Sequence, residues 1–464
     1  MNSKVSLRKR KCILTYARSW NGLAATRCLG KHGIYVITGD IDAVAAANFS
    51  RYSKEQFVYP DPEADPDGFI NKLVDVARAH AAADTDLVLM PLFTDIYPIL
   101  CQKDRFDGLA KLVLPPKESY EIAGSKARLA AYCRELGIRI PPTSVIGNAE
   151  EFYECARKTE YPAFVKIPTG SASIGMCKVS SYEEAISAFR DMVQRYNIVG
   201  RELLPILQTC VGGEDYCSTF LFDHGEYRAS MTYHNIVDFP RDKGMGALRE
   251  TVDAHPLERI GIELLSKLSW NGVAEMDFRW DGVSEPWLIE INPRFWGGLA
   301  QSIESGWLYP AWMYDLAVDG QTEPQKPKKI DVRTSNPGLM ILRMIQDFAD
   351  ARDSMPAIAE AYNEFNCEQK KKNAAAVMRL VKKMSSAIDL PARLRAVVKL
   401  IKKERGAINE YFSWDDPLPI LGLIYPLMVY IKHGVITPEL LVGEKALHKT
   451  IHRSDECSKK DGSS

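Results

Sequence analysis

Three polar residues alternate within one short apolar stretch of the sequence, Trp287–Gly298: they are Glu290, Asn292 and Arg294. Residues two apart on a β-strand face the same side, so these three side chains can point into one site. A carboxylate and an amide oxygen suit a hard cation such as Mg²⁺, and a guanidinium suits a phosphate held by that cation. We therefore predict that this strand carries a site for a metal and a phosphate.

A further carboxylate is expected in the same site. The pattern of Ala274–Gly282 predicts a strand and a turn leading back into Trp287–Ile291, which places Asp277 opposite Glu290. The alternative is an ordinary sheet edge with solvated acids. An acid inside an apolar run is costly to bury without a partner, which favours a metal site. The predicted metal ligands are Asp277, Glu290 and Asn292.

The stretch Tyr161–Val179 combines a lysine on an apolar strand with a loop of small residues. Lys166 lies near the end of the strand, and Gly170 and Gly175 lie in the loop. Glycines let the backbone approach an anion closely, and free N–H groups there can cradle phosphate. The stretch lacks the G-K-[S/T] of a Walker A loop. A plain hairpin is the alternative, but an unpaired ammonium on a buried strand would be costly.

These stretches resemble the ATP-grasp superfamily, whose members commonly carry an E-x-N-P-R segment preceded by an acidic strand. The resemblance covers about residues 12–320 and ends much as in carboxylate–amine ligases related to the carbamoyl-phosphate synthase large chain. It implies ATP and Mg²⁺ as cofactors, with Mn²⁺ as the alternative metal. It also implies that Lys126, at a helix start, and Lys166 reach the phosphates. A flexible loop would cover those phosphates, with Gly170, Ser171, Ser173 and Gly175 as its candidate contacts.

The stretch Leu203–Tyr216 resembles the adenine hinge of that superfamily. The backbone around Cys210 and Val211 is then expected to meet the adenine edge, and Gln208 stands where the family often has Glu. An acid four residues past the hinge would hold the ribose hydroxyls, which indicates Asp215, with Glu214 as the alternative. The resemblance also indicates His234 as a phosphate contact, with a purely structural role equally open.

The alternation of elements predicts a fold of α/β and α+β type. A Rossmann-like pre-ATP-grasp domain is expected first, but its β-α-β unit lacks the full G-x-G-x-x-G, so no dinucleotide site is predicted. Asp95 follows one of its strands and is open between contacting a substrate and capping the next helix. A two-subdomain ATP-grasp fold and a helical C-terminal region follow. The expected boundaries are 1–116 for the first domain, 117–320 for the ATP-grasp domain (nucleotide subdomain about 117–210, metal and acceptor subdomain about 211–320), 321–330 for a linker and 331–464 for the helical basic region.

The composition is that of an ordinary soluble protein. The 464 residues have a formal net charge of -1, so nothing global attracts nucleic acid. The ten cysteines form no C-x-x-C pair, which favours free thiols in a reducing compartment. No signal peptide is evident, and a cytoplasmic location is expected. A homodimer is left open.

The tail differs from the rest of the chain in charge. Residues 368–405 hold twelve Lys and Arg against three acids, with apolar residues at helical spacing, and the apolar run Leu418–Ile431 follows. One interpretation is peripheral contact of residues 368–431 with the inner face of an anionic membrane. The other is two helices that pack on the body of the protein and leave their lysines in solvent.

The resemblance implies an ATP-dependent ligase that joins a carboxylate to an amine through an acylphosphate. Lys126, Lys166 and the glycine loop would hold the phosphates, and Arg294 would stabilise the developing acylphosphate. The substrates are expected to be a small-molecule or lipid-linked carboxylate and amine. One alternative is a bicarbonate-using enzyme of carbamoyl-phosphate or carboxylase type, although the sequence has no second ATP-grasp copy. The other is a non-catalytic nucleotide-binding scaffold at a membrane.

Overall fold

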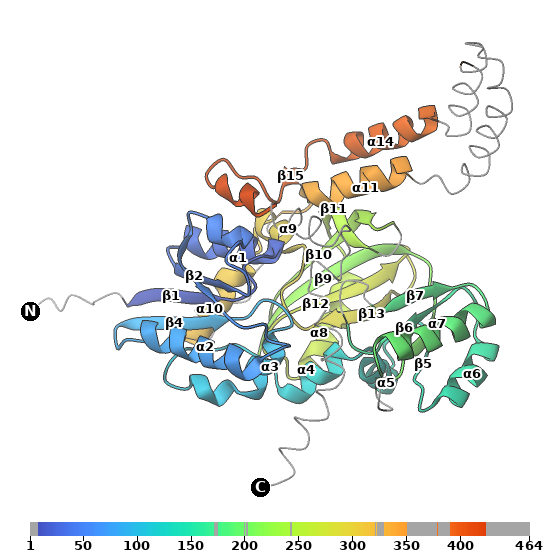
Figure 1. The fold of residues 1–464 in the computed structure, drawn as a ribbon, viewed down its shortest axis with the longest axis horizontal. Coiled ribbons are helices and arrows are strands. Elements are labelled where there is room, and N and C mark those ends of the chain that lie inside the picture. Colours follow the sequence, from blue (N-terminus) through green and yellow to red (C-terminus); the bar gives the residue numbers. More distant parts are fainter. Residues whose placement is uncertain are drawn as a thin grey trace, which may run out of the picture.

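The computed structural model describes residues 8–170, 175–198, 200, 203–241, 244–320, 322, 329–349, 378 and 390–423. Within these residues three β-sheets form the body of the molecule (Figure 1). The N-terminal sheet and the small four-stranded sheet lie on opposite sides of a large seven-stranded sheet (Figure 1). The parts that carry the predicted site residues therefore converge on the middle of the molecule.

The N-terminal sheet is parallel and has the order β3-β2-β1-β4. Its inner strands begin at exposed residues and are buried further along, as Ile13, Leu14 and Val36 illustrate. In such a sheet the loops after the strands meet at one edge, where open α/β sheets bind ligands. The elements are β1 (Lys9–Leu14), α1 (Trp20–Lys31), β2 (Tyr35–Asp40), η1 (Ala46–Phe49), β3 (Ser53–Val58), α2 (Pro66–His80), β4 (Thr85–Met90), α3 (Ile96–Cys101) and η2 (Lys103–Phe106).

The small sheet is antiparallel, with the order β5-β8-β6-β7. Its helices α6 and α7 pack together over one face, where the rings of Phe152 and Phe189 stack with centroids 4.1 Å apart. Helices α4 (Lys117–Gly124) and α5 (Lys126–Leu136) precede it, and α5 begins at Ser125, whose side chain accepts a hydrogen bond from the Arg128 N–H. The other elements are β5 (Thr143–Ser144), α6 (Ala149–Lys158), β6 (Ala163–Lys166), β7 (Met176–Val179), α7 (Tyr182–Arg195) and β8 (Ile206–Thr209).

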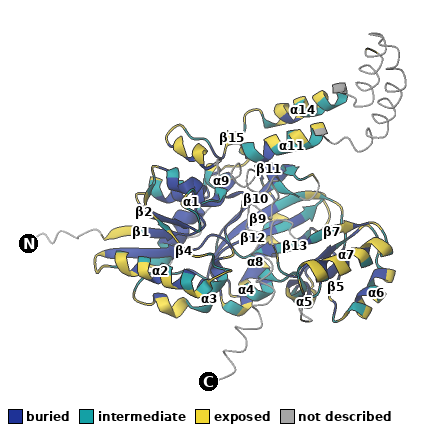
Figure 2. Ribbon diagram, in the orientation of Figure 1, coloured by how far each residue is buried: buried dark blue, intermediate teal, exposed yellow. Residues whose placement is uncertain are grey.

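The large sheet has the order β13-β12-β9-β10-β11-β14-β15 and is antiparallel except for the last pair. Helix α8 (His255–Lys267) covers one face, and α9 (Leu299–Glu304) and α10 (Tyr309–Asp319) lie between the other face and the N-terminal sheet. The strands are β9 (Glu214–Asp223), β10 (Glu226–Phe239), β11 (Met245–Val252), β12 (Gly272–Trp280), β13 (Trp287–Asn292), β14 (Arg333–Ser335) and β15 (Ile408–Asn409). Figure 2 shows these central strands as mostly buried, with the exposed residues on the outer helices.

The C-terminal region contains helices, as predicted, but it also completes the large sheet. Helix α11 (Pro337–Ala349) packs on β10 and β11 and against α14 (Leu390–Glu404), and the strand β15 then pairs with β14. The turn η5 (Leu418–Leu423) rests on η1 of the N-terminal domain. The region is therefore not wholly helical, and its described end packs on the body of the protein.

None of the helices that the structure describes combines the length and apolar character that a membrane crossing requires. Of the predicted membrane-contact segment 368–431, residues 368–377, 379–389 and 424–431 lie outside the described residues. Within the described part, Leu394, Val398 and Ile401 of α14 are exposed, and Leu400 is buried. The domain boundaries expected at 116, 210, 320 and 330 stay predictions.

Candidate active site

A cavity of about 590 Å³ lies where the three sheets meet. We call its two sides the hinge end, formed by Lys166, Lys178 and Gln208–Val211, and the aromatic end, formed by Tyr16, Trp20, Phe93, Tyr411 and the arginines beside them. The ends of β12 and β13 line the cavity between the two. The site predicted from the sequence is thus one part of a larger chamber.

The predicted hairpin of β12 and β13 is present. Asp277 lies opposite Glu290 and Glu275 lies opposite Asn292 in the register of the two strands. The Asn292 amide donates to one carboxylate oxygen of Glu275 and to one of Asp277, both at 3.2 Å. The structure thus brings together the residues that the sequence predicted as metal ligands, and all of them line the cavity.

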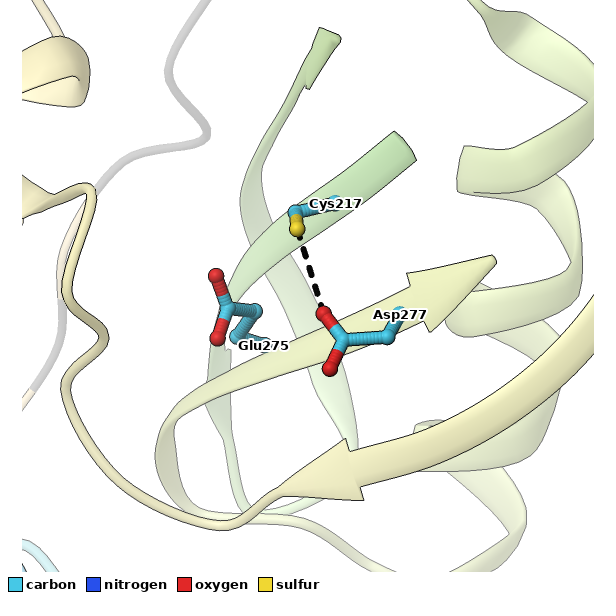
Figure 3. Close-up of side chains that lie close together, drawn as sticks. All are labelled: Cys217, Glu275 and Asp277. Carbon is cyan, nitrogen blue, oxygen red and sulfur yellow. Dashed lines mark hydrogen bonds between the residues drawn. The ribbon is translucent and has the colours of Figure 1, made fainter. Parts of the chain in front are cut away.

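A carboxylate that the sequence analysis did not select, Glu275, belongs to the same cluster. Figure 3 shows Glu275 and Asp277 on one strand facing Cys217, whose Sγ lies 3.1 Å from Oδ1 of Asp277. One ligand atom from each of the three residues lies within 4.8 Å of the others. The sequence spacing could have identified Glu275, because it lies two residues before Asp277 on the predicted strand and such residues share a face.

The electrostatics of this cluster fit a bound cation. Burial, together with the negative charges of Glu275, Glu290 and Asp215, raises the pKa of Asp277 well above its usual range. Burial also raises the pKa of Glu275. Buried acids that repel one another are stabilised by a cation among them, and carboxylate and amide oxygens are the donors that Mg²⁺ prefers. The chemistry of the donor set therefore fits Mg²⁺.

Two lysines reach the cluster from the small sheet and the helix before it. The Nζ of Lys126 lies 2.9 Å from Oε2 of Glu290 and 3.0 Å from the Gly170 carbonyl oxygen. Lys166 is buried, and its Nζ donates to Oε1 of Gln208 at 2.8 Å. Burial lowers the pKa of Lys166 to about 8, although the charge of Glu290 opposes the shift. Both lysines line the cavity beside the acids, where a phosphate would need them.

The predicted phosphate loop is described at its two ends. Gly170 and Gly175 line the cavity, and both have positive φ, 154° and 66°. A Cβ on Gly175 would lie 2.4 Å from the side chain of Ile167, so the turn there requires glycine. Ser171 and Ser173, the other predicted contacts in this loop, lie outside the described residues.

The predicted hinge lies at the other side of the lysines. Gln208, Cys210 and Val211 line the cavity, as does Asp215 further along. Burial raises the pKa of Asp215, and a hydrogen bond of 3.0 Å from the Asn235 amide opposes that shift. The contacts of these residues with adenine and ribose stay predictions.

Glu214 and His234 do not line the cavity. On β9 and β10 they point to the opposite face from Asp215 and Asn235, because neighbouring strand residues alternate. His234 stacks on Tyr216 with ring centroids 4.7 Å apart, and its Nε2 lies 3.5 Å from Oε2 of Glu214. Their predicted contacts with the nucleotide find no support in these positions, and the structural alternative for His234 is favoured.

Arg294 is the cation that the structure leaves available at the aromatic end. Its guanidinium donates to the Asn292 side-chain oxygen and to the Phe295 carbonyl oxygen, both at 2.9 Å. No described carboxylate lies within ion-pair distance of it. Arg18 and Arg249, by contrast, pair with Asp40 and Glu410 at 2.8 and 2.6 Å. Arg294 can therefore receive an anion without giving up an ion pair.

The remainder of the aromatic end comes from segments that sequence patterns did not select. A C-terminal strap, residues 408–423, contributes Tyr411 and Gly422 to the lining. Two buried acids fix the strap: Glu410 pairs with Arg249, and Asp416 pairs with Arg27 at 2.8 Å. Asp95 does not line the cavity, and it accepts a hydrogen bond of 2.8 Å from the Phe93 N–H instead of capping α3.

The comparisons with known proteins agree with this geometry. A family described as ATP-grasp in the biosynthetic pathway with Ter operon matches residues 230–337. No curated protein sequence matches the chain. Several hundred solved chains resemble the fold, and three illustrate the range of proteins that have it.

The first is the biotin carboxylase of Campylobacter jejuni in a β-γ-ATP complex, with a TM-score of 0.55 and 15% identity over 71% of this chain and 75% of that one. The second is the biotin carboxylase domain dimer of the Hydrogenobacter thermophilus 2-oxoglutarate carboxylase with MgADP, ADP and bicarbonate, with a TM-score of 0.53 and 16% identity over 71% and 73%. The third is the L-amino acid ligase of Bacillus licheniformis, with a TM-score of 0.51 and 15% identity over 69% and 78%.

The chain has the ATP-grasp fold, which confirms the resemblance and the fold class predicted from the sequence. Identities this low establish the fold alone. The three relatives include two carboxylases and an amino acid ligase, so the shared fold does not choose between these reactions. The choice depends on the residues of the cavity.

Proposed function

We propose that this protein is a Mg²⁺-dependent ligase that uses ATP to join a carboxylate to an amine through an acylphosphate. The observation that carries the proposal is one cavity in which Asp277, Glu290 and Asn292 meet two lysines and an arginine that forms no ion pair with a described carboxylate. In one chamber, the acids and the amide suit a metal, the lysines suit a polyphosphate, and the arginine suits a second anionic reactant.

Each residue group has a separate task in this proposal. Gln208, Cys210 and Val211 border the adenine, and Asp215 binds the ribose. Lys126 and Lys166 neutralise the phosphates, with Gly170 and Gly175 framing the loop above them. Asp277, Glu290 and Asn292 would hold Mg²⁺, with Glu275 at their side, and bound Mg²⁺ would neutralise charge on the transferring phosphoryl group.

The reaction then needs two displacements. A carboxylate oxygen of the first substrate attacks the γ-phosphorus, ADP leaves, and Arg294 offsets the charge that develops on the acylphosphate. The amine next attacks the acyl carbon, the new C–N bond forms, phosphate leaves, and the amine loses a proton to solvent. No covalent bond to the enzyme is required. The aromatic end, with its arginines, is where the carboxylate substrate would lie.

The bicarbonate-using alternative has the same fold as two biotin carboxylase structures, one of them with bound bicarbonate. Bicarbonate is small, however, and the aromatic end provides a chamber bordered by four aromatic side chains, which suits a larger substrate. A non-catalytic scaffold would have no need of the complete set of acids. A cytoplasmic location, a homodimer and membrane contact through residues 368–431 stay predictions.

Release of ADP from MgATP tests the proposal. The protein is incubated with a pool of carboxylates and amines, with bicarbonate alone, and with neither, and products are identified by mass spectrometry. We expect continued release of ADP only when a carboxylate and an amine are both present, and at most one ADP per enzyme with the carboxylate alone. A carboxylate labelled with ¹⁸O should pass one labelled oxygen to the released phosphate, because the acylphosphate oxygen leaves with phosphorus. ADP release with bicarbonate alone would favour the alternative, and no release under any condition would contradict both.

A further inference from the structure

Four side chains form a continuous stack along one side of the aromatic end. The guanidinium carbon of Arg18 lies 4.5 Å from the centre of the Tyr16 ring. The rings of Tyr16 and Phe93 stack with centroids 4.6 Å apart and planes inclined by 16°. On the far side, the guanidinium carbon of Arg294 lies 4.4 Å from the centre of the Phe93 ring. All four line the cavity.

The stack joins separate parts of the molecule. Tyr16 and Arg18 follow β1 and Phe93 follows β4, at the ligand-binding edge of the N-terminal sheet, whereas Arg294 follows β13 of the large sheet. A guanidinium over an aromatic face and two parallel rings are both favourable arrangements. The N-terminal domain thus reaches the reacting part of the ATP-grasp domain through side-chain stacking.

The two aromatic rings are held from behind. Tyr16 has φ of 59°, in the left-handed region that an aromatic residue seldom adopts, and its N–H donates to the Tyr59 hydroxyl at 2.8 Å. Local strain of this kind persists only where the surrounding structure imposes it, and it concentrates at functional sites. The Phe93 N–H donates to Asp95 at 2.8 Å, which fixes the second ring.

Arg294 itself is held in a different way from the other arginines of the chamber. Its two hydrogen bonds, to Asn292 and to the Phe295 carbonyl, lie along the edge of the guanidinium, and Phe93 covers one of its faces. No described carboxylate forms an ion pair with Arg294, so Phe93 is the contact that holds the guanidinium beside these two hydrogen bonds. A long arginine side chain has many rotamers. The contact with Phe93 restricts them, so the positive charge of Arg294 stays at one position in the chamber.

We propose that Tyr16 and Phe93 are positioning residues that orient Arg294 toward the transferred phosphoryl group. The inference rests on the role of Arg294 in the proposed function. Phe93 acts by direct contact with the guanidinium, and Tyr16 acts one layer behind it. The N-terminal domain then has a task in the reaction beyond supporting the fold, since it sets the orientation of a cation that belongs to another domain.

The binding of two nucleotides tests this without turnover. AMP-PNP is a triphosphate analogue that cannot be hydrolysed. It presents a γ-phosphoryl group and ADP does not, so Arg294 should favour the binding of AMP-PNP. We measure both affinities with Mg²⁺ by calorimetry and divide the affinity for AMP-PNP by the affinity for ADP. Arg294→Met should lower the ratio by about tenfold, and Phe93→Leu by about three- to tenfold. Phe93→Tyr, which keeps the ring, should leave it unchanged.

Coupling between the two residues separates positioning from general damage. If Phe93 acts through Arg294, Phe93→Leu should have no further effect on the ratio in a protein that already carries Arg294→Met. Phe152→Leu is the matched control, because it removes a ring from a stacked pair that does not line the cavity. It should leave the ratio unchanged. Should Phe93→Leu fail to fold, Tyr16→Leu tests the same stack one layer further from Arg294.

The outcomes distinguish the inference from the function on which it rests. A lower ratio with Arg294→Met but not with Phe93→Leu, or independent effects in the double variant, would overturn the positioning role alone. An unchanged ratio in Arg294→Met would overturn the role of Arg294 and the inference together. The expected ratios without any ADP release from carboxylates and amines would support the positioning role and contradict the ligase.

Discussion

The two ends of the cavity differ in how the chain builds them. The hinge end comes from positions close in sequence, Lys166, Lys178 and Gln208–Val211, carried by the small sheet and the loop that follows β8. The aromatic end draws on residues near 16–21, 93, 249, 294 and 411–422, which belong to the N-terminal domain, the large sheet with the loop after β13, and the C-terminal strap. The comparison shows that the hinge end is local in sequence, whereas the aromatic end is an assembly of distant segments.

The forces that hold the two ends differ as well. The hinge end relies on backbone pairing between β6, β7 and β8 and on a buried lysine bonded to Gln208. The aromatic end relies on stacked rings and on buried ion pairs such as Arg249–Glu410, whose partners lie 161 positions apart in the chain. Changes at the hinge end should therefore affect the binding of ATP. Changes at the aromatic end should affect the binding of the carboxylate substrate and the attachment of the strap.

The largest effect is expected between the two ends, at the acids. Glu290→Gln removes a charged ligand of the predicted Mg²⁺ and the partner of Lys126, so turnover should fall by at least about a thousandfold. The fold should survive, since glutamine has nearly the same shape. ADP release and circular dichroism check the two parts. Glu263→Gln, on the exposed face of α8, is the control. Unchanged ADP release in Glu290→Gln would contradict the metal assignment.

The next effect concerns the strap. Glu410→Ala leaves Arg249 as a buried charge without its partner, which should lower the free energy of unfolding by about 3 kcal/mol. The KM for the carboxylate should rise, while the affinity for ATP should stay within about twofold, because the strap borders only the aromatic end.

A second acid of the strap provides the control for that experiment. Asp415 pairs with Lys31, and both side chains are about half exposed, at 41% and 49%. Asp415→Ala should therefore change the free energy of unfolding by less than about 1 kcal/mol. Denaturant unfolding and nucleotide titration measure both variants. An equal loss of stability in the two variants would show that burial of the Arg249–Glu410 pair adds no stability. An equal loss of ATP affinity would contradict the prediction that the strap affects the aromatic end and not the hinge end.

The smallest effect is a pH dependence at the hinge end. Burial lowers the pKa of Lys166 to about 8, so the ammonium is charged below that pH and loses its proton as the pH rises through it. A bound phosphate raises the pKa, and we expect ATP affinity to fall about threefold between pH 7.5 and 9.5. Adenosine affinity should not change. In Lys166→Met the ATP affinity should be weaker throughout and lack this pH dependence. Equal losses for ATP and adenosine would show that Lys166 is structural.

The sequence predicted much of the fold and of the central site, and the reasons are local. Alternation along β12 and β13 was enough to place Asp277 opposite Glu290. The same alternation places Glu275 on the face of β12 that carries Asp277, where it accepts a hydrogen bond from Asn292. For Glu214 and His234 the sequence spacing was insufficient, since a shift of one residue along a strand moves a side chain to the other face.

By itself, the sequence determined the alternation of strands and helices in the N-terminal domain, the hairpin of acids and the stretches that form the hinge end. Those features follow from periodicity and from contacts between neighbouring segments, which one stretch of sequence carries within it. Only the tertiary structure decided that Tyr16 and Phe93 stack on Arg294, and that the strap places Tyr411 in the same chamber. Such contacts join residues that lie far apart in the chain and that no helix or strand pattern relates to one another. Whether they meet depends on how the sheets and helices pack around the cavity.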